Sequence, residues 1–168
     1  MGVGKGENFW YDWGMSRYEP LKIEQKWQDK WEKERPFEAR DGVDGPKMYL
    51  AEMFPYPSGA GLHVGHVRNF SIVDALARFY GQNGLNVLRP LGYDTFGLPA
   101  ENYAIKTGIP PQEATGANIE NFRKQMKKLG FAIDWSREIN TSDPEYYRWT
   151  QWCFLQLFEK GLAYQKES

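Results

Sequence analysis

Apolar residues recur at helical spacing near the beginning of the chain. Among the Lys and Glu residues that follow position 18, three apolar side chains lie four residues apart: Ile23, Trp27 and Trp31. This spacing predicts an amphipathic helix, which should end before Pro36 because proline cannot continue a helix. We expect this helix to pack against the main sheet of the domain.

The next pattern predicts two strands joined by a helix. The run KMYLAEMF, at residues 47–54, has the length and apolar character of a buried parallel strand. After a loop rich in Pro and Gly, apolar residues at spacings of three and four across residues 67–80 predict a helix that ends near Gly81 or Gly84. The run NVLRPLGY, at residues 86–93, follows as a second strand. This order predicts an α/β fold with a parallel sheet.

A third amphipathic helix is predicted before Gly130. Its apolar stripe consists of Ile119, Phe122, Met126 and Leu129. The other side carries four basic residues: Arg123, Lys124, Lys127 and Lys128. A lysine-rich side is typical of a solvated helix face, and contact with nucleic acid is the alternative that the pattern leaves open.

The last helix is predicted to begin at the sequence SDPE. Ser142 or Asp143 can cap it, Pro144 suits its first turn, and Glu145 can complete a capping box. Its body, YYRWTQWCFLQLFEKG, is apolar nearly all round. Such a helix should be buried on more than one side. If the chain is truncated, we expect one of those sides to be bare.

Composition narrows the class of protein. The 168 residues are 41% apolar, which suffices for a sizeable core, and the formal net charge of −1 provides no overall basic field for nucleic acid. The single cysteine, Cys153, excludes an internal disulfide and a cysteine-based zinc site. No apolar run approaches the ~20 residues that span a bilayer, and no basic-then-apolar leader is present, so we expect no membrane contact and a cytoplasmic location.

The first residues form a separate region of the sequence. Residues 1–17, MGVGKGENFWYDWGMSR, are glycine-rich and aromatic and have neither helical nor strand periodicity. We interpret them as an amino-terminal tail, with an aromatic contact segment as the alternative. We expect residues 18–168 to form the amino-terminal half of a nucleotide-binding catalytic domain, as the motifs below imply.

The two histidines of the chain mark a candidate anion-binding site. His63 and His66 lie three residues apart, after the loop PYPSGAG and at the start of the first crossover helix. Ligands of open α/β sheets bind at the carboxyl ends of strands, where unpaired helix N–H groups attract phosphate. Gly65 leaves room for a flat ring against the backbone. Two surface histidines that cap a helix are the alternative; half of a metal site is disfavoured because no third ligand lies nearby, so we expect no metal ligands.

The letters around these histidines resemble a known family. PYPSGAGLHVGH resembles the HIGH signature of class I aminoacyl-tRNA synthetases. MFPYPSG before the signature and GYDTFGLPAEN after it resemble leucyl-tRNA synthetases, and DWSRE, PEYYRW and EKGLAY follow in the order of that family. The resemblance extends from about Tyr18 to Lys166. It implies a Rossmann-like parallel sheet with flanking helices, as the amino-terminal half of a class I synthetase catalytic domain.

For the nucleotide, the resemblance implies roles on this loop. His63 and His66 would approach the triphosphate of ATP as catalytic residues, and Gly65 would let the adenine stack against the chain. The loop that contains Ser58 and Gly59 would complete the ATP site, with Mg²⁺ sharing the charge of the phosphates.

For the amino acid, the resemblance implies a pocket on the same side. Met53, Phe54 and Tyr56 would form part of the leucine pocket, and the Asp94 carboxylate would hold the leucine ammonium group. Met53 and Phe54 could alternatively be core residues at a strand end. Asp94 could alternatively cap the following helix or bind solvent.

The implied reaction is activation of leucine by ATP to leucyl-adenylate, followed by transfer to tRNA(Leu). The substrate carboxylate is the nucleophile, so no enzymic base is needed for the first step. A lysine loop of the KMSKS type occurs nowhere in these residues, and we expect a carboxyl-terminal half of the synthetase to supply it. Two departures from the family lie near the pocket: Ala60 and Gly61 lengthen the loop, and Tyr93 stands where Trp is common.

Two other functions remain open. The chain could be a non-catalytic ATP-binding or assembly fragment, which acts only when joined to a complementary half. It could also be another nucleotidyltransferase with paired histidines, although such enzymes would not carry PYPSG or GLPAEN.

Overall fold

A computed structural model describes residues 18–57, 59 and 61–167 of the chain. The proposed tail at 1–17 and the predicted site residue Ser58 lie outside the described residues. In chain order the elements are α1 (Pro20–Glu34), β1 (Lys47–Tyr49), α2 (Val64–Gln82), β2 (Asn86–Leu88), β3 (Gly92–Tyr93), α3 (Leu98–Thr107), α4 (Pro111–Leu129), η1 (Trp135–Arg137), β4 (Ile139–Asn140) and α5 (Pro144–Glu159).

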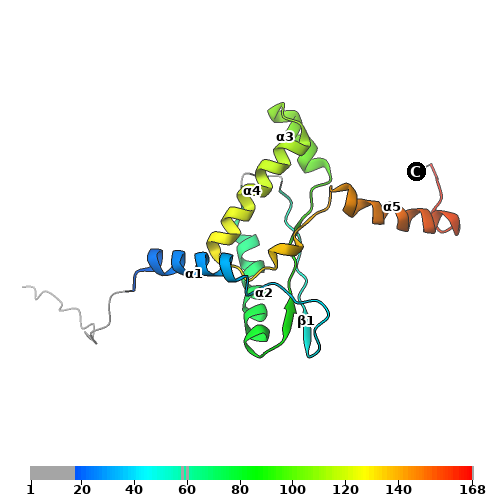
Figure 1. The fold of residues 1–168 in the computed structure, drawn as a ribbon. Coiled ribbons are helices and arrows are strands. Elements are labelled where there is room, and N and C mark those ends of the chain that lie inside the picture. Colours follow the sequence, from blue (N-terminus) through cyan, green and yellow to red (C-terminus); the bar gives the residue numbers. More distant parts are fainter. Residues whose placement is uncertain (1–17, 58, 60, 168) are drawn as a thin grey trace, which may run out of the picture.

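The strand–helix–strand unit is confirmed, with shorter strands than expected. β1 and β2 pair in parallel, with Met48 opposite Val87, and α2 connects them (Figure 1). The run predicted as one strand at 86–93 is split into β2 and β3, because Pro90 has no N–H group to continue the ladder. β3 pairs in parallel with β4 in a second sheet. The fold is therefore α/β with two small parallel sheets.

The prediction of a buried strand over 47–54 is wrong. β1 has three residues, and none of them is buried. The following Leu50 N–H still donates to Leu88 O at 2.9 Å, after which the chain leaves the sheet. The Glu52 carboxylate bonds to the Arg89 side chain instead, at 2.8 Å from Nε, and Pro55 follows. The apolar letters of this run therefore belong mostly to a loop.

The hydrophobic core lies between α2, α4, β3 and the segment that follows α4. Its buried members are Phe70, Leu91, Tyr93, Ile119, Phe122, Met126, Phe131 and Ile133. The predicted stripe on α4 is confirmed at three positions, while its fourth member, Leu129, is 49% exposed at the helix end. This core places the amino-terminal turn of α2 and the end of β3 on one rigid support.

α1 does not pack against the sheet, contrary to expectation. It crosses the carboxyl end of α4, where Gln28 Nε2 donates to Lys128 O at 2.8 Å. The Trp31 ring lies against Gly130, which ends α4 with a positive φ of 72°. A Cβ on Gly130 would come within 3.1 Å of that ring. The close approach of Trp31 therefore requires a glycine at this helix end.

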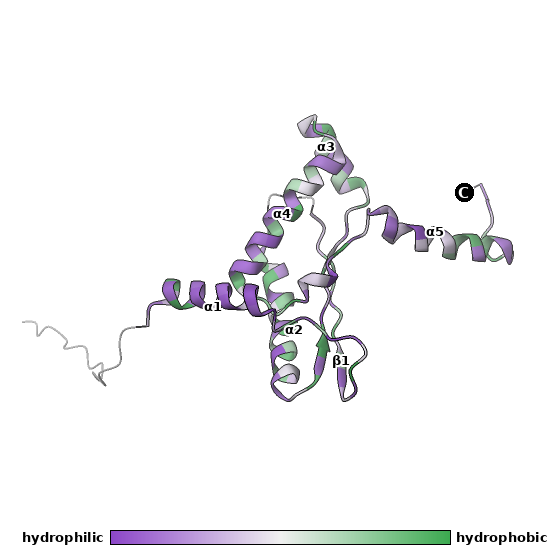
Figure 2. Cartoon of the chain, in the orientation of Figure 1, coloured by the Kyte–Doolittle hydropathy of each residue, from purple (hydrophilic) through white to green (hydrophobic). Residues whose placement is uncertain are grey.

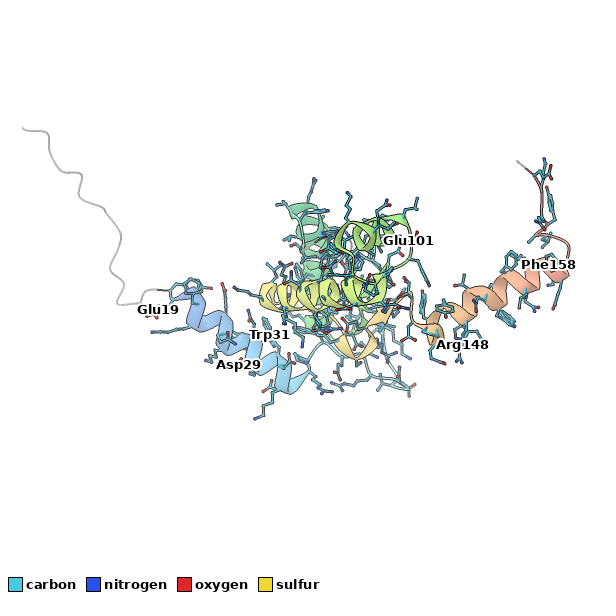
Figure 3. The ribbon with its side chains drawn as sticks, turned by 90° about the horizontal axis from the view of Figure 1, so that it is seen from above. Glu19, Asp29, Trp31, Glu101, Arg148 and Phe158 are labelled. Carbon is cyan, nitrogen blue, oxygen red and sulfur yellow. The ribbon has the colours of Figure 1, made fainter. Side chains whose placement is uncertain are left out.

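α5 extends away from the rest of the chain (Figures 1 and 3). None of its 16 residues is buried, and hydrophobic positions occur along its length (Figure 2). The predicted cap is confirmed at Asp143, whose side chain accepts from the Glu145 N–H at 3.0 Å. The expected capping box is wrong, because Glu145 stands at the second helical position and not the third. No helix in the described part of the chain is long and apolar enough to cross a membrane.

Candidate active site

The two histidines form a reciprocal cap at the start of α2. His63 is the N-cap residue, in an extended conformation, and its Nδ1 accepts the His66 N–H at 3.3 Å. His66 Nδ1 in turn accepts the His63 N–H at 3.3 Å. The two rings stack with centroids 3.7 Å apart. The capping interpretation of these residues is therefore confirmed.

The cap also determines which nitrogen of each imidazole ring can donate a hydrogen bond. Because each Nδ1 accepts a backbone N–H, the neutral form of each ring carries its proton on Nε2. Burial of the His66 ring, together with the neighbouring His63, lowers the pKa of His66. His66 is therefore neutral at pH 7, with Nε2–H as a donor. Capping and anion binding are compatible, since they use different nitrogens.

Gly65 is required by this arrangement. A Cβ at this position would lie 2.9 Å from Cε1 of the His63 ring. The flat ring that the glycine admits in the structure is therefore the imidazole of His63. Stacking of an adenine on Gly65 stays a prediction.

α4 holds the loop before the histidines at two points. Asn118 Nδ2 donates to Pro57 O at 2.8 Å, and the Leu62 N–H donates to Gln125 Oε1 at 2.7 Å. Sequence reasoning missed both residues. The signal was a pair of polar residues seven apart beside the apolar stripe of α4, which places them on one helix face.

The loop that carries the predicted leucine-binding residues approaches the end of β3 at Phe54 and Pro55. The Asp94 N–H donates to Pro55 O at 3.0 Å, which joins the strand end to the loop. Phe54 is half-buried, and a Cβ on Gly92 would overlap its ring. Met53 is 72% exposed and Tyr56 is 53% exposed. The core alternative is therefore wrong for Met53.

The Asp94 side chain is available to a ligand. The N-cap of α3 is Gly97, without a side-chain hydrogen bond, so Asp94 does not cap that helix. No hydrogen bond or ion pair of the Asp94 carboxylate is found within residues 18–57, 59 and 61–167. A half-buried carboxylate without an ion-pair partner among the described residues favours a cationic ligand.

A buried ion network supports the loop immediately before Met53. The Arg89 side chain, 1% exposed, pairs with Glu52 at 2.8 Å and with Asp74 of α2 at 2.9 Å. It also donates to the Phe70 and Ala132 carbonyls. Burial raises the pKa of Glu52 despite the Arg89 charge. Sequence reasoning missed this network, which fixes the loop relative to α2.

The described residues offer no protein cage for a metal. No group of three or more His, Cys, Asp or Glu side chains with metal-binding geometry is found in the part of the chain that the structure describes. Mg²⁺ commonly binds through substrate phosphates with few protein ligands. An Mg²⁺ ion that accompanies ATP stays a prediction.

The basic side of α4 is partly neutralised. Arg123 Nη2 pairs with Glu138 at 2.8 Å, and Lys127 pairs with Glu32 of α1 at 2.9 Å. These pairs favour the interpretation as a solvated, ion-paired face over nucleic-acid contact.

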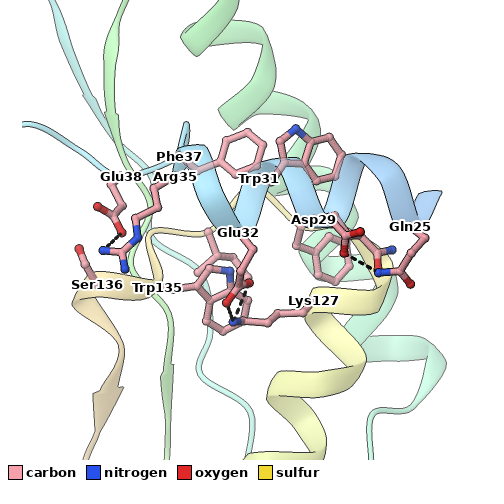
Figure 4. A pocket seen from close by; sticks show the side chains of 14 residues that line it. Gln25, Asp29, Trp31, Glu32, Arg35, Phe37, Glu38, Lys127, Trp135 and Ser136 are labelled. Carbon is pink, nitrogen blue, oxygen red and sulfur yellow. Dashed lines mark hydrogen bonds and ion pairs between the residues drawn. The ribbon is translucent and has the colours of Figure 1, made fainter. Parts of the chain in front are cut away.

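Three cavities lie apart from the histidines. One of about 480 Å³ lies between α1, α4 and η1, and its lining includes Trp31, Phe37 and Trp135, of which Trp135 lies beside the Glu32–Lys127 pair (Figure 4). A second, of about 1080 Å³, lies between Thr95, α3 and the start of α5, and a third of about 670 Å³ adjoins β2.

Comparison with known proteins decides the family. Residues 26–168 match the family described as tRNA synthetases class I (I, L, M and V). The chain belongs to the class I tRNA synthetases. The family resemblance carried by the histidine loop is thereby confirmed, and the chain is a ligase by family. The histidine loop, the end of β3 and α2 therefore belong to a synthetase catalytic-domain fold.

Two solved synthetases are similar to this chain. The ternary complex of Agrobacterium radiobacter K84 agnB2 LeuRS with tRNA and LeuAMS has 43% sequence identity and a TM-score of 0.84, covering 90% of this chain. Mycobacterium tuberculosis methionyl-tRNA synthetase in complex with methionyl-adenylate has 26% identity and a TM-score of 0.64, covering 70% of this chain. This synthetase chain spans 20% and 22% of the lengths of those two proteins.

Proposed function

We propose that this chain carries the ATP and leucine sites with which a leucyl-tRNA synthetase makes leucyl-adenylate. The observation that carries the proposal is the bond from the Asp94 N–H to Pro55 O, 3.0 Å long. It joins a carboxylate without a partner in the described residues to the loop that leads into the histidine cap. The higher identity to the LeuRS complex, 43% against 26% for the methionyl enzyme, favours leucine.

The nucleotide half of the proposal uses the start of α2. His63 and His66 would donate Nε2–H to the triphosphate, beside those N–H groups of the first helical turn that the cap does not use. Ser58 and Gly59 would bring loop groups to the phosphates, Gly65 would face the adenine, and Mg²⁺ would accompany ATP. A neutral imidazole such as that of His66 still stabilises an anionic oxygen, because a hydrogen-bond donor needs no net charge.

The amino-acid half uses the loop and the end of β3. The Asp94 carboxylate would bind the ammonium group that all amino acids share. The exposed Met53 and Tyr56, with the half-buried Phe54, would contact the leucine side chain. A cation held at one end and an apolar side chain at the other fix the direction of the substrate carboxylate.

The geometry supports catalysis by alignment. The leucine carboxylate oxygen attacks the α-phosphate, and pyrophosphate leaves from the opposite side. These residues orient the two substrates and stabilise the developing charge, without removing a proton. Transfer of leucine to tRNA(Leu) is proposed for the enzyme to which this chain belongs.

A substitution that keeps the cap tests the nucleotide site. His63→Asn retains a good N-cap residue but removes the imidazole Nε2–H. We expect ATP affinity, measured by calorimetric titration, to fall by a factor of about 10 to 150, since a lost hydrogen bond to a charged group is worth about 1.5–3 kcal/mol. Helix content and thermal midpoint should stay unchanged. Arg148→Ala, on the exposed α5, is the control, and unaltered ATP affinity in His63→Asn would contradict the proposal.

We further propose that activation requires polypeptide beyond these residues. None of the residues of α5 is buried, and the chain spans a fifth of the length of the LeuRS that it resembles. One missing oxyanion-type donor typically lowers the rate by about a hundredfold to a thousandfold. Leucine-dependent ATP–pyrophosphate exchange should therefore be weak for this chain and should rise when the remainder of a related synthetase is added. Equal rates with and without that remainder would refute this.

A further inference from the structure

Tyr93, directly before Asp94, is anchored by its hydroxyl group. The side chain is 1% exposed within the core, and its hydroxyl donates to Glu138 Oε1 at 2.7 Å. Burial and this acceptor raise the pKa of Tyr93, so the hydroxyl stays a donor at every pH at which the protein is used. The residue before the proposed ammonium ligand is therefore fixed by a polar contact as well as by packing.

Glu138 is itself held by a second element. Arg123 of α4 donates from Nε to Glu138 Oε1 at 2.9 Å and from Nη2 to Oε2 at 2.8 Å. Arg123 also pairs with Glu120, one turn earlier on α4. Two parallel bonds to one carboxylate restrict its rotation. The chain Tyr93–Glu138–Arg123 thus connects β3, the segment before β4, and α4.

The backbone on both sides of Asp94 is tied to the same segment. The Thr141 N–H donates to Tyr93 O at 3.1 Å, and the Thr95 N–H donates to Thr141 Oγ1 at 2.9 Å. The hydroxyl of Thr95 donates to Asn140 Oδ1 at 2.6 Å. The Asp94 carboxylate, which no described side chain holds, therefore takes its direction from its fixed neighbours.

We propose that the Tyr93–Glu138–Arg123 chain positions Asp94 for the ammonium group of the amino-acid substrate. The role of Asp94 in this inference rests on the proposed function. The hydrogen bonds that fix the backbone around Asp94 do not depend on that function. Tyr93, Glu138 and Arg123 are positioning residues, since each acts through Asp94. Removing the Tyr93 hydroxyl leaves the packed ring in place but releases β3 from Glu138. The hydrogen bond from the Asp94 N–H to Pro55 O should therefore break more often.

Hydrogen exchange tests the positioning without a ligand. In ¹⁵N-labelled protein, Tyr93→Phe and Glu138→Ala should each accelerate exchange of the Asp94 amide by about tenfold, the effect of about 1.4 kcal/mol. Glu138→Gln keeps an oxygen acceptor and should restore part of the protection. The His66 amide, in the α2 cap, should exchange at the wild-type rate, and Tyr146→Phe on the exposed α5 is the matched control. Unchanged Asp94 exchange in both variants would overturn the inference.

A double-mutant cycle tests the consequence for the substrate. LeuAMS and sulfamoyl-adenosine, which lacks the leucyl group, are titrated into wild type, Asp94→Asn, Tyr93→Phe and the double variant. We expect each single variant to lose about tenfold or more in LeuAMS affinity and little for sulfamoyl-adenosine. The double variant should bind LeuAMS no more weakly than Asp94→Asn alone.

The outcomes separate the inference from the proposed function. If wild type does not bind LeuAMS, or if Asp94→Asn binds it as wild type does, the proposed role of Asp94 fails and the exchange experiment alone decides the positioning. If Asp94→Asn loses affinity but the Tyr93→Phe loss is absent or fully additive, the proposed function stands and the positioning is refuted.

Discussion

α4 and α5 both carry large apolar residues, yet they differ completely in burial. Six residues of α4 are buried, and Phe122 and Met126 are 1% and 0% exposed. No residue of α5 is buried, and Trp149, Phe154 and Phe158 are each more than half exposed. The apolar residues of α4 form one stripe, whereas those of α5 surround the helix. A stripe orients a helix on a core, while apolar content alone does not.

The two helices also differ in how they contact the candidate site. α4 holds the histidine loop through Asn118 and Gln125 and holds Glu138 through Arg123. α5 approaches the site only at its beginning in the described part of the chain, through the segment after β4 and through the Tyr147 ring, whose centroid lies 5.7 Å from that of Phe96. Regions with few buried contacts open at low free energy. We therefore expect substitutions in α4 and its neighbours to affect global unfolding, and matched substitutions in α5 to have no such effect.

The largest expected effect is at the buried ion network. Arg89→Ala leaves the Glu52 carboxylate, 0% exposed, without its cation, while Asp74 keeps only its pair with Arg78. Breaking a buried pair from one side costs about 3–5 kcal/mol. Urea denaturation should show a loss of that size. Arg148→Ala, which removes an exposed pair with Glu145 on α5, is the control, and a comparable loss there would contradict the contrast.

Two matched phenylalanine substitutions compare the contributions of α4 and α5 to the free energy of unfolding. Phe122→Ala should lower the free energy of unfolding by about 3 kcal/mol or more, because it opens a cavity in the core. Phe154→Ala, on α5, should change it by less than about 0.5 kcal/mol. Both values follow from urea midpoints at a constant m-value. Similar losses would show that α5 is packed in solution.

The cap of α5 should have a local effect only. Asp143→Ala removes the acceptor for the Glu145 N–H, and a lost N-cap costs about 1 kcal/mol. Because α5 buries no residue, we expect faster amide exchange in its first turn and no change in the urea midpoint. A shift of the global midpoint would mean that α5 contributes to cooperative folding.

The smallest expected effect is a pH dependence at the start of α2. The pKa of His66 is lowered in the folded state, so the unfolded chain binds the proton more readily. Stability should therefore fall as pH decreases through the unfolded value of about 6.5, while above it this group has no effect. His66→Asn should remove that part of the dependence in urea titrations at pH 7.5 and pH 5.5. An unchanged pH profile in the variant would contradict the assignment.

The helices could be predicted from local pattern, and the strands only in part. Ile23, Trp27 and Trp31 predicted α1 because helical periodicity depends on neighbouring residues. The strand length at 47–54 could not be predicted, because apolar residues in a strand, a pocket loop and a core have the same composition. Pro90 was visible as a ladder breaker within NVLRPLGY, and it explains the split into β2 and β3.

In the candidate site, too, local features could be predicted from the sequence, and contacts between distant segments could not. The spacing of His63 and His66 indicated a helix start, and the cap confirms it. The pairing of Asp94 with the loop at Pro55 required the fold, since the two segments are far apart in the chain and meet through a backbone bond. Asn118, Gln125 and Arg89 were missed because their partners are backbone groups and side chains brought from other elements.

The sequence by itself determined the family, the helix positions and the residue types of the site, because motifs and periodicity are local properties. The tertiary structure decided where α1 packs, how short the strands are, and that α5 is uncovered. It also decided which polar groups hold the loop and the end of β3. These features depend on contacts between distant segments, whose free energy is set by burial and hydrogen-bond partners that one segment does not contain.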